Sequence, residues 1–373
     1  MLVVGEASGD AHAARVITEL KKQAPNTLVS GIGGDNLRAA GMNVIIDFSE
    51  LAVMGLLEVL KRYRYLKQIF DQMVELLKTE KPDLLVLVDY PGFNLKLAKE
   101  AKRLSIPVMY YISPKVWAWR KGRVKTIKQV VDEMLVLFPF ELPIYEKAGV
   151  PVKCVGHPLI DAVQRKLTTE QAKKKLSLDE GHKVVGLFPG SRRSEVEVLL
   201  PLMIQAGSKL YKNNPELQFV LPIAPGLDAT IFNSILIHAL IPVQVVSSDF
   251  YELTSACDVI VAASGTVTLE IALLNVPHFI CYRVSPLTYG IMSRLVKIPY
   301  VGLCNIITGK KLITEIIQDE VTVDRLEEEL HDRLTRDDSQ VVAAKVGQEV
   351  RSSLGPAGGA HNAAERILVK LAQ

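Results

Sequence analysis

Residues 84–104 read LLVLVDYPGFNLKLAKEAKRL: five consecutive apolar residues, a Pro-Gly turn, and then a segment with helical spacing. An unbroken apolar run is typical of a parallel strand that is covered on both faces of its sheet. The chain begins in the same way, because LVVG (2–5) leads into SGDAHAARVITELKKQ (8–23). This alternation of short apolar and longer amphipathic runs predicts βαβ units and an α/β fold with parallel sheets.

The chain of 373 residues is longer than one hydrophobic core usually serves, so two domains are expected. The alternation lapses in a charged stretch over 156–183 and restarts with VVGLFPGSRRSEV (184–196). We therefore expect two doubly wound, Rossmann-like domains, 1–162 and 163–342, followed by a helical tail. Two such domains leave a cleft between the carboxyl ends of their strands, so the chemistry should lie in strand-to-helix turns.

The composition excludes several classes of protein. The net charge of +3, from 44 basic and 41 acidic residues, is too small to indicate nucleic-acid binding. The four cysteines lack CxxC or ligand spacing, so we expect reduced thiols, as in a cytoplasm. The turns carry no DxD or HxxxH cluster, so we expect no bound metal ion, and no cofactor is expected either. No apolar run is long enough to cross a bilayer, but a mean hydropathy of +0.20 leaves contact with a membrane surface open.

In the second domain, LFPGSRRSEVEVLLPLM (187–203) joins a buried strand to a helix. Gly190 and Ser191 lie at the turn, and Arg192 and Arg193 stand where the helix dipole disfavours cations. A helix N-terminus that combines a glycine with two arginines favours a bound phosphate. A solvent-exposed cap with surface arginines is the alternative, because Gly-Ser turns are common.

A second turn of this kind lies in VAASGTVTLEIALLNVP (261–277), where Ser264, Gly265 and Thr266 precede a helix that carries Thr268 and Glu270. Hydroxyl and N–H groups there could hold a phosphate or a sugar, and Glu270 could accept hydrogen bonds from a ribose. The alternative is helix capping by Thr266. Two such turns on strands that are expected to be neighbours predict a nucleotide diphosphate site.

The first domain offers carboxylates at two turns. GEASGDAH (5–12) sets Glu6, Asp10 and His12 around a Ser-Gly turn, and its spacing is not the GxGxxG of dinucleotide folds. Asp89 follows the apolar run quoted above, so it should project at the carboxyl edge of the sheet. Low-dielectric surroundings would raise the pKa of this carboxyl and suit it to act as a general base. An aspartate that braces its loop is the commoner alternative.

Two further motifs are ambiguous. SPKVWAWRKGR (113–123) contains both tryptophans, which pack in a core or an interface more often than against a ligand. His157 precedes a proline at the expected domain boundary. Its position beside the cleft is compatible with ligand binding or with a structural role.

The stretch LAVMGLLEVLKRYRYLK (51–67) sets an apolar segment directly against a basic one. Four of its residues have the i, i+3, i+4, i+7 spacing of an amphipathic helix, for which a core-facing stripe is the usual interpretation. A membrane-facing edge is the other interpretation. The residues that would form this edge are Val53, Met54, Leu56, Leu57, Leu60, Lys61, Arg62, Arg64 and Lys67.

Eight sequence motifs occur in this chain in the same order as in one enzyme family. They are GEASGDAH, VMGLLEVL, DYPGFNLKLA, YYISPKVWAWR, LVLFPFE, VGHPLID, LFPGSRRSEV and ASGTVTLE. In these motifs, from about residue 3 to 320, the chain resembles lipid-A-disaccharide synthase, a UDP-sugar glycosyltransferase of Gram-negative bacteria. The resemblance implies a GT-B fold, an acceptor site in the first domain, a UDP-sugar site in the second, and C-terminal helices, about 343–373, that return to the first.

The implied reaction joins UDP-2,3-diacylglucosamine to 2,3-diacylglucosamine 1-phosphate, with inversion and without a metal. The resemblance makes Asp89 the candidate base, with Glu6 as a second catalytic carboxylate. The residues it implies for binding the UDP-sugar are Gly190, Ser191, Arg192, Ser264, Gly265, Thr266, Thr268, Glu270 and His157. Further cleft candidates are Asp10, Asn94, Arg283, Asn305, Glu315 and Gln318.

Acylated substrates would be taken from a bilayer surface. They therefore favour the membrane-facing interpretation of residues 51–67 over the core-facing one. In this interpretation the apolar residues form a surface beside the acceptor site, and the basic residues face anionic headgroups. The expected location is the cytoplasm, at the surface of the inner membrane, and a homodimer is left open.

Two alternatives remain at this point, one of them an enzyme and the other from a different class of protein. Another UDP-sugar enzyme on the same fold, such as a UDP-GlcNAc 2-epimerase, would not need the apolar segment. A non-catalytic nucleotide-sugar-binding membrane protein would not need Asp89, Arg192 and Glu270.

Overall fold

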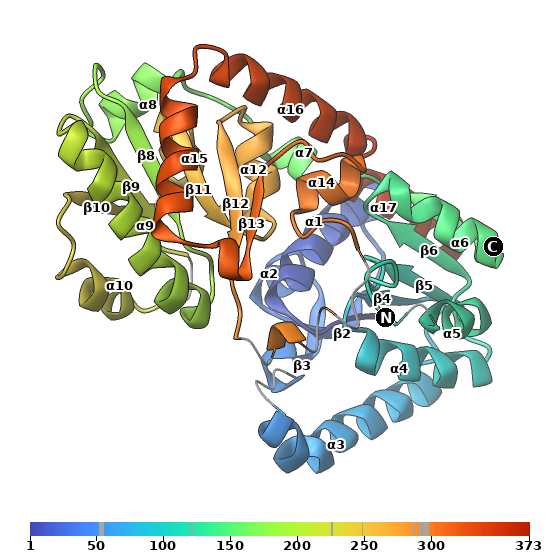
Figure 1. Ribbon diagram of the computed structural model, residues 1–373. Coiled ribbons are helices and arrows are strands. Elements are labelled where there is room, and N and C mark those ends of the chain that lie inside the picture. The colour runs from blue at the N-terminus through green and yellow to red at the C-terminus, as the bar shows by residue number, and fades with distance from the viewer. Residues whose placement is uncertain are drawn as a thin grey trace. The chain divides into compact units, whose positions relative to one another are not determined.

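The computed structural model describes residues 1–51, 56–120, 122–224, 227–247, 249–285, 288–290, 293 and 298–373, and for residues 56–63 it describes the backbone alone. Two compact units divide the chain: Met1–Asp161 with Leu354–Gln373 form the first, and Ala162–Ser353 form the second. Each unit contains one parallel sheet with helices around it (Figure 1).

The sheet of the first unit has seven strands. They are β1 (Leu2–Val4), β2 (Ser30–Gly33), β3 (Asn43–Asp47), β4 (Leu85–Val88), β5 (Val108–Tyr111), β6 (Glu133–Val136) and β7 (Val152–Cys154). All described pairs are parallel, and the order across the sheet is β3-β2-β1-β4-β5-β6-β7. The direction in which strands are added therefore reverses between β1 and β4, which is where ligands bind in such sheets.

Helices cover both faces of this sheet, which explains the unbroken apolar run of β4. Leu85 and Leu87 belong to one core cluster, whereas Val86 and Val88 belong to the cluster on the opposite face. The helices are α1 (Ala7–Gln23), α2 (Asp35–Ala39), α3 (Leu56–Glu80), α4 (Pro91–Arg103), α5 (Arg123–Val130), α6 (Leu142–Ala148), α7 (Leu159–Ala162) and α17 (Gly359–Leu371), with 3-10 turns η1 (Phe48–Leu51) and η2 (Pro139–Glu141).

The second unit repeats the plan with six strands. They are β8 (Val184–Phe188), β9 (Gln218–Pro222), β10 (Val243–Val246), β11 (Val259–Ala263), β12 (His278–Tyr282) and β13 (Glu315–Ile317), in the order β10-β9-β8-β11-β12-β13. The order reverses between β8 and β11, which pair in parallel. The predicted fold class, two Rossmann-like parallel sheets, is therefore confirmed.

The helices of the second unit include one that the sequence analysis assigned differently. They are α8 (Thr169–Lys175), α9 (Arg193–Asn213), α10 (Ala229–Leu236), α11 (Phe250–Ala256), α12 (Val267–Leu273), α14 (Leu303–Thr308), α15 (Val323–Thr335) and α16 (Ser339–Ser353), with η3 (Gln318–Glu320). Because α16 packs on α12 and α14, it belongs to this unit. The segment that returns to the first unit thus begins at Leu354 rather than at about residue 343.

The returning segment is fixed by packing and by polar contacts. Helix α17 packs along α1 and buries Ala363, Ala364 and Ile367 in the core of the first unit (Figure 1). Arg366 binds the nearly buried carboxylate of Glu133 at 2.8 Å. The C-terminal residues are therefore an integral part of the first sheet's cover.

Only part of the 51–67 stretch can be compared with its prediction. Val53 and Met54 lie outside the described residues, as do the side chains of Leu56, Leu57, Leu60, Lys61 and Arg62. Arg64 and Lys67 are exposed on α3, whereas Ile69, Met73 and Leu77 further along it are buried on the sheet. In the described part of the chain, no helix combines the length and apolar character that a membrane span requires.

We predict that Gly156→Ala strongly destabilises the protein. Gly156 has φ +93, and a Cβ atom there would lie 1.9 Å from the carbonyl oxygen of Pro356 in the returning segment. The expected loss is roughly 3 kcal/mol of unfolding free energy, measured by urea denaturation.

Gly92→Ala is the matched control, because a Cβ atom at Gly92 would meet nothing within 4 Å. Equal stability of the two variants would show that residues 354–358 do not dock as described.

Candidate functional site

In the first unit, two loops meet where the strand order reverses. Val4 at the end of β1 pairs with Val88 at the end of β4, so the turn that starts at Gly5 lies beside the turn that starts at Asp89. A Cβ atom on Gly5 would lie 2.1 Å from Cγ of Tyr90. Glycine is therefore required at position 5 for the two turns to approach.

The β4 turn is held in an unusual conformation. Asp89 and Tyr90 are consecutive non-glycine residues in the left-handed region, with φ +44 and +45, which costs about 1–3 kcal/mol each. The carbonyl oxygen of Asp89 accepts hydrogen bonds from the buried amide of Asn94, at 2.8 Å, and from the hydroxyl of Tyr110. Asn94, predicted as a cleft residue, thus fixes the turn from within.

This conformation sets the Asp89 side chain in a half-buried position at the sheet edge. Burial, and secondarily the nearby carboxylate of Glu6, raise its pKa to about 6, although Lys115 and Arg123 act in the opposite direction. Glu6 itself is exposed and accepts a hydrogen bond from Ser8 Oγ at 2.6 Å. A carboxyl with a pKa near 6 can accept and release a proton close to neutral pH.

Asp10 has a structural role instead of a position open to a ligand. It is 1% exposed, and its carboxylate accepts hydrogen bonds from the backbone of Gly34 (2.6 Å) and from the backbone and side chain of Asn36 (3.1 and 2.9 Å). Asp10 therefore connects α1 to the loop between β2 and α2.

His157 lies among side chains of the first unit. Its ring stacks on Phe138, with centroids 5.1 Å apart, and meets the edge of His12 at 6.3 Å. Burial lowers the pKa of His157 to about 3, so this imidazole is neutral, and its Nδ1 accepts from the backbone of Leu159. The structure thus gives His157 the environment of a packed aromatic side chain.

The first phosphate-type turn of the second unit, at Gly190–Arg192, already binds a carboxylate of the chain itself. Gly190 has φ +113, and Glu195 on α9 folds back so that its Oε2 accepts from the backbone N–H groups of Ser191 (3.1 Å) and Arg192 (3.2 Å). Arg192 also binds Glu195 Oε1 at 2.9 Å, yet its side chain is 77% exposed. The turn therefore has the donors that an anion needs, and the sequence analysis missed that Glu195 already uses them.

The second turn lies beside the first, as predicted, because β8 and β11 are neighbours. Thr266 is exposed at the start of α12 and its side chain makes no capping hydrogen bond, so the capping alternative is not realised. Thr268, in contrast, is buried and donates to the carbonyl of Gly265 at 2.8 Å. Glu270 is half-buried, and burial raises its pKa while Tyr251 donates a hydrogen bond to it at 3.1 Å.

Three of the remaining cleft candidates brace these turns. Glu315 accepts from the backbone of Val301 (2.8 Å) and from Asn305 (2.8 Å), and Ser264 Oγ donates to the carbonyl of Val301 (3.2 Å). Gln318 exchanges two hydrogen bonds with the backbone of Val284. Asn305 and half-buried Glu315 thus position the β11 turn through the loop that holds Val301, and Gln318 fixes the chain just after β12.

Arg283 differs from these bracing residues. It follows β12 at the carboxyl edge and has no hydrogen bond or ion pair with any described residue. Together with Arg192 it gives this edge cationic groups that can face an anion. Among the described residues, no three His, Cys, Asp or Glu side chains gather closely enough to hold a metal ion.

The comparisons with known proteins identify the family. Residues 1–367 match the family model described as "Lipid-A-disaccharide synthetase". The chain belongs to the lipid-A-disaccharide synthetase family. The chain is 43% identical over 372 residues to the lipid-A-disaccharide synthase of Geobacter sulfurreducens (100% of this chain, 97% of that protein), and 40% identical over 368 residues to that of Coxiella burnetii (98% and 97%).

Solved structures with low sequence identity share the fold. The UDP-GlcNAc 2-epimerase of Neisseria meningitidis, solved with UDP-GlcNAc bound, is 15% identical with a TM-score of 0.64, covering 100% of this chain and 98% of that one. At that identity the likeness concerns the fold alone. Membership of the lipid-A-disaccharide synthetase family makes the chain a glycosyltransferase of lipid A synthesis, and neither alternative function is favoured.

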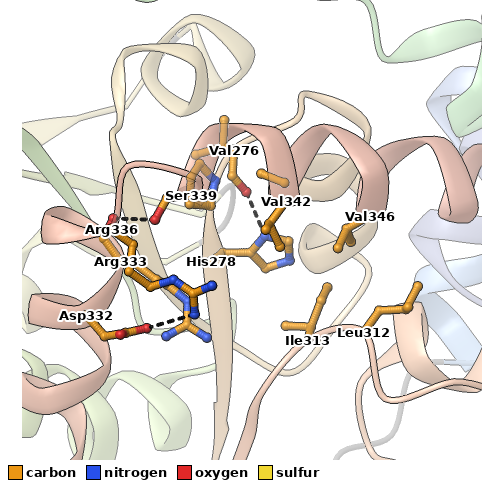
Figure 2. A pocket seen from close by; sticks show the side chains of 12 residues that line it. Val276, His278, Leu312, Ile313, Asp332, Arg333, Arg336, Ser339, Val342 and Val346 are labelled. Carbon is orange, nitrogen blue, oxygen red and sulfur yellow. Dashed lines mark hydrogen bonds and ion pairs between the residues drawn. The ribbon is translucent and has the colours of Figure 1, made fainter.

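The second unit also contains a pocket that none of the predicted site residues lines. It lies at the amino end of β12, where His278 begins the strand, among side chains of α15, α16 and the loop that holds Leu312 and Ile313 (Figure 2). His278 is 7% exposed there, and its Nδ1 lies 2.8 Å from the carbonyl of Val276. Nδ1 must donate to that carbonyl, so Nε2 is an acceptor, and it has no partner.

We predict that His278 makes the second unit sensitive to acid. Burial lowers its pKa to about 4, so below the ordinary value of 6.5 the unfolded chain takes up the proton first, and stability present above pH 6.5 is lost as the pH falls toward 4. Urea denaturation should show that His278→Gln reduces the loss of unfolding free energy between pH 7.5 and 5 by about 2 kcal/mol.

His238→Gln, which changes an exposed histidine of the same unit, is the control and should leave the pH dependence of the native chain unchanged. If His278→Gln behaves like this control, the buried imidazole does not set the acid sensitivity.

Proposed function

We propose that the chain transfers 2,3-diacylglucosamine from its UDP derivative to O6 of 2,3-diacylglucosamine 1-phosphate. The first unit binds the acceptor at the β1 and β4 turns, and the second unit binds the UDP moiety at the β8 and β11 turns. The products are UDP and a β-1,6-linked disaccharide 1-phosphate. The assignment of these roles rests on the chemistry of the two sheet edges and on the substrates that the family implies.

The observation that carries the proposal is the strained, half-buried Asp89 with its raised pKa. Asp89 accepts the proton of the acceptor 6-hydroxyl as O6 forms its bond to C1 of the donor. The bond between C1 and the UDP oxygen breaks on the opposite face, which inverts the anomeric centre. Glu6 supports this step because its charge helps to keep the pKa of Asp89 high enough for a base.

The leaving diphosphate needs positive charge and N–H donors. Arg192 and the N-terminus of α9 supply them, with the Ser264–Thr266 turn beside them. The N–H groups of Ser191 and Arg192 join them when the diphosphate displaces the Glu195 carboxylate that they bind in the free chain. Glu270 lies one helical turn further on and accepts from the ribose hydroxyls. Arg283 adds a cation at the same edge.

The acylated substrates also require access to a lipid surface. We assign this access to residues 51–67, where apolar residues precede four cations. Each cation contributes about 1 kcal/mol near an anionic surface. In this proposal the enzyme works at the cytoplasmic face of the inner membrane as a peripheral protein.

The reaction is tested by incubating the purified chain with both acylated sugars and measuring UDP and disaccharide by mass spectrometry. We predict that Asp89→Asn lowers kcat by roughly 10²–10⁴-fold, because the amide cannot accept the proton. In the native chain kcat/KM should fall as the pH drops below about 6, since the base must be ionised.

Glu6→Gln tests the same assignment without removing the base. Loss of the neighbouring charge lowers the pKa of Asp89, so the acidic limb of kcat/KM should move to lower pH. A native chain that forms no disaccharide would refute the reaction. Disaccharide formation with full activity in Asp89→Asn would remove Asp89 from the mechanism.

We predict that replacing Val53, Met54, Leu56, Leu57 and Leu60 together by serine moves the protein from the membrane to the soluble fraction. The physical reason is loss of apolar area that enters the lipid interface. Sedimentation with vesicles of phosphatidylethanolamine and phosphatidylglycerol measures the change, and circular dichroism checks the fold. An unfolded variant, or one that still sediments with vesicles, would contradict a membrane role.

A further inference from the structure

A group of cations lies next to Asp89 and has no role so far. Lys115, Arg120 and Arg123 follow β5, the strand adjacent to β4, and therefore lie at the same carboxyl edge as Asp89. We call them the post-β5 cations. The charges of Lys115 and Arg123 both act on the carboxyl of Asp89, as expected for cations that follow the neighbouring strand.

An exposed tryptophan organises two of these cations. The Cζ atoms of Arg120 and Arg123 lie 4.7 and 5.3 Å from the ring centroid of Trp119, within the range of cation–π contacts. Trp119 is 39% exposed, so it is not core filling. Trp117, two residues earlier, instead packs its ring edge on Phe140. The two tryptophans therefore lie in different surroundings.

Among the described residues, no carboxylate is paired with the post-β5 cations. In the described part of the chain, none of their side chains makes an ion pair or a hydrogen bond to a carboxylate, whereas Lys102 and Arg103 at the end of α4 are paired with Asp132 and Glu100. Burial, and secondarily the charge of Arg120, lower the pKa of Arg123. Positive charges that lie close together repel one another, and binding of an anionic ligand would relieve this repulsion.

The local backbone increases this cationic character. Arg123 is the first residue of α5, where the helix dipole favours anions over cations. Arg120 lies in the left-handed region with φ +52, which turns the chain just before the helix. The arrangement joins two guanidinium groups, an ammonium group and a helix N-terminus on one loop.

We propose that the post-β5 cations bind the phosphate monoester of the acceptor sugar. The proposal rests on the function proposed above, in which donor and acceptor contain the same diacylated glucosamine. The acceptor differs from the donor in having a phosphate monoester in place of UDP, so only that group can direct the sugar to the Asp89 edge. Guanidinium groups bind phosphate oxygens through paired, charge-assisted hydrogen bonds.

The same cations also resolve an electrostatic difficulty. A phosphate dianion close to Asp89 and Glu6 would raise the pKa of Asp89 further and leave the base protonated at neutral pH. Lys115 and Arg123 lower that pKa. The post-β5 cations thus allow an anionic substrate to bind while the base stays ionised.

The test compares Arg120→Gln and Arg123→Gln with the native chain in mixed detergent micelles. Each variant should raise the KM for 2,3-diacylglucosamine 1-phosphate about tenfold, equivalent to about 1.4 kcal/mol, and leave the KM for the UDP donor unchanged. Arg123→Lys, which keeps the charge, should recover part of the loss. Lys128→Gln removes the same charge from an exposed position on α5 and should match the native chain.

A second arm uses 2,3-diacylglucosamine without its phosphate as acceptor. The native chain should use it poorly, and the arginine variants should lose the preference for the phosphorylated acceptor. An unchanged KM in both variants, or an equal loss with both acceptors, overturns the proposal. If the native chain forms no disaccharide, the proposed function itself fails, which separates the two results.

A third arm distinguishes the acceptor's phosphate from lipid headgroups. Both variants should sediment with vesicles of phosphatidylethanolamine and phosphatidylglycerol as the native chain does. If instead they lose vesicle binding and retain the KM for the acceptor in micelles, the cations serve the membrane surface and the proposal is wrong.

Discussion

The parallel pairing of β4 with β1 is the constraint on which the first unit depends. These strands are separated by about eighty residues, and their contact reverses the order of the sheet. Helices that leave neighbouring strands on either side of such a reversal diverge to opposite faces, which leaves the strand ends open to a ligand. Asp89 and Glu6 derive their positions from this pairing, and Asp10 fixes the start of α1 to the residues that follow β2. In the second unit, β8 and β11 do the same for the two phosphate-type turns.

Rigidity around these edges comes from buried polar groups. Asn94 and Tyr110 hold the carbonyl of Asp89, while Asn305 and Glu315 hold the loop that receives Ser264. A buried amide or carboxylate that lost its partner would cost about 1–3 kcal/mol, so these networks favour one arrangement of each loop. The strained backbone at Asp89 and Tyr90 can persist because its surroundings fix it.

The sequence predicted the strands, their turns and the neighbouring positions of the two nucleotide-type turns, because apolar runs and glycines report local structure directly. It did not predict that Asp10, Asn94 and Thr268 are used internally. Asp10 binds a backbone group 24 residues away, which only folding brings near it. Asn94 and Thr268 bind carbonyl groups six and three residues away, which their side chains reach only in the particular conformation of each turn. Glu195 was missed for a related reason: its position three residues after Arg192 was visible, but its carboxylate could also have faced solvent. For the cations around Trp119 the available signal was their place after β5, the strand next to β4.

The return of α17 to the first unit has a consequence for synthesis of the chain on the ribosome. The sheet face that Ala363, Ala364 and Ile367 cover stays open until residues 354–373 have emerged, after the entire second unit. The second unit is continuous in sequence and can fold first, whereas the first unit, although it begins the chain, is completed last. The apolar surface that α17 later covers is therefore exposed while the ribosome synthesises nearly two hundred further residues. Chaperones can bind this surface during that interval.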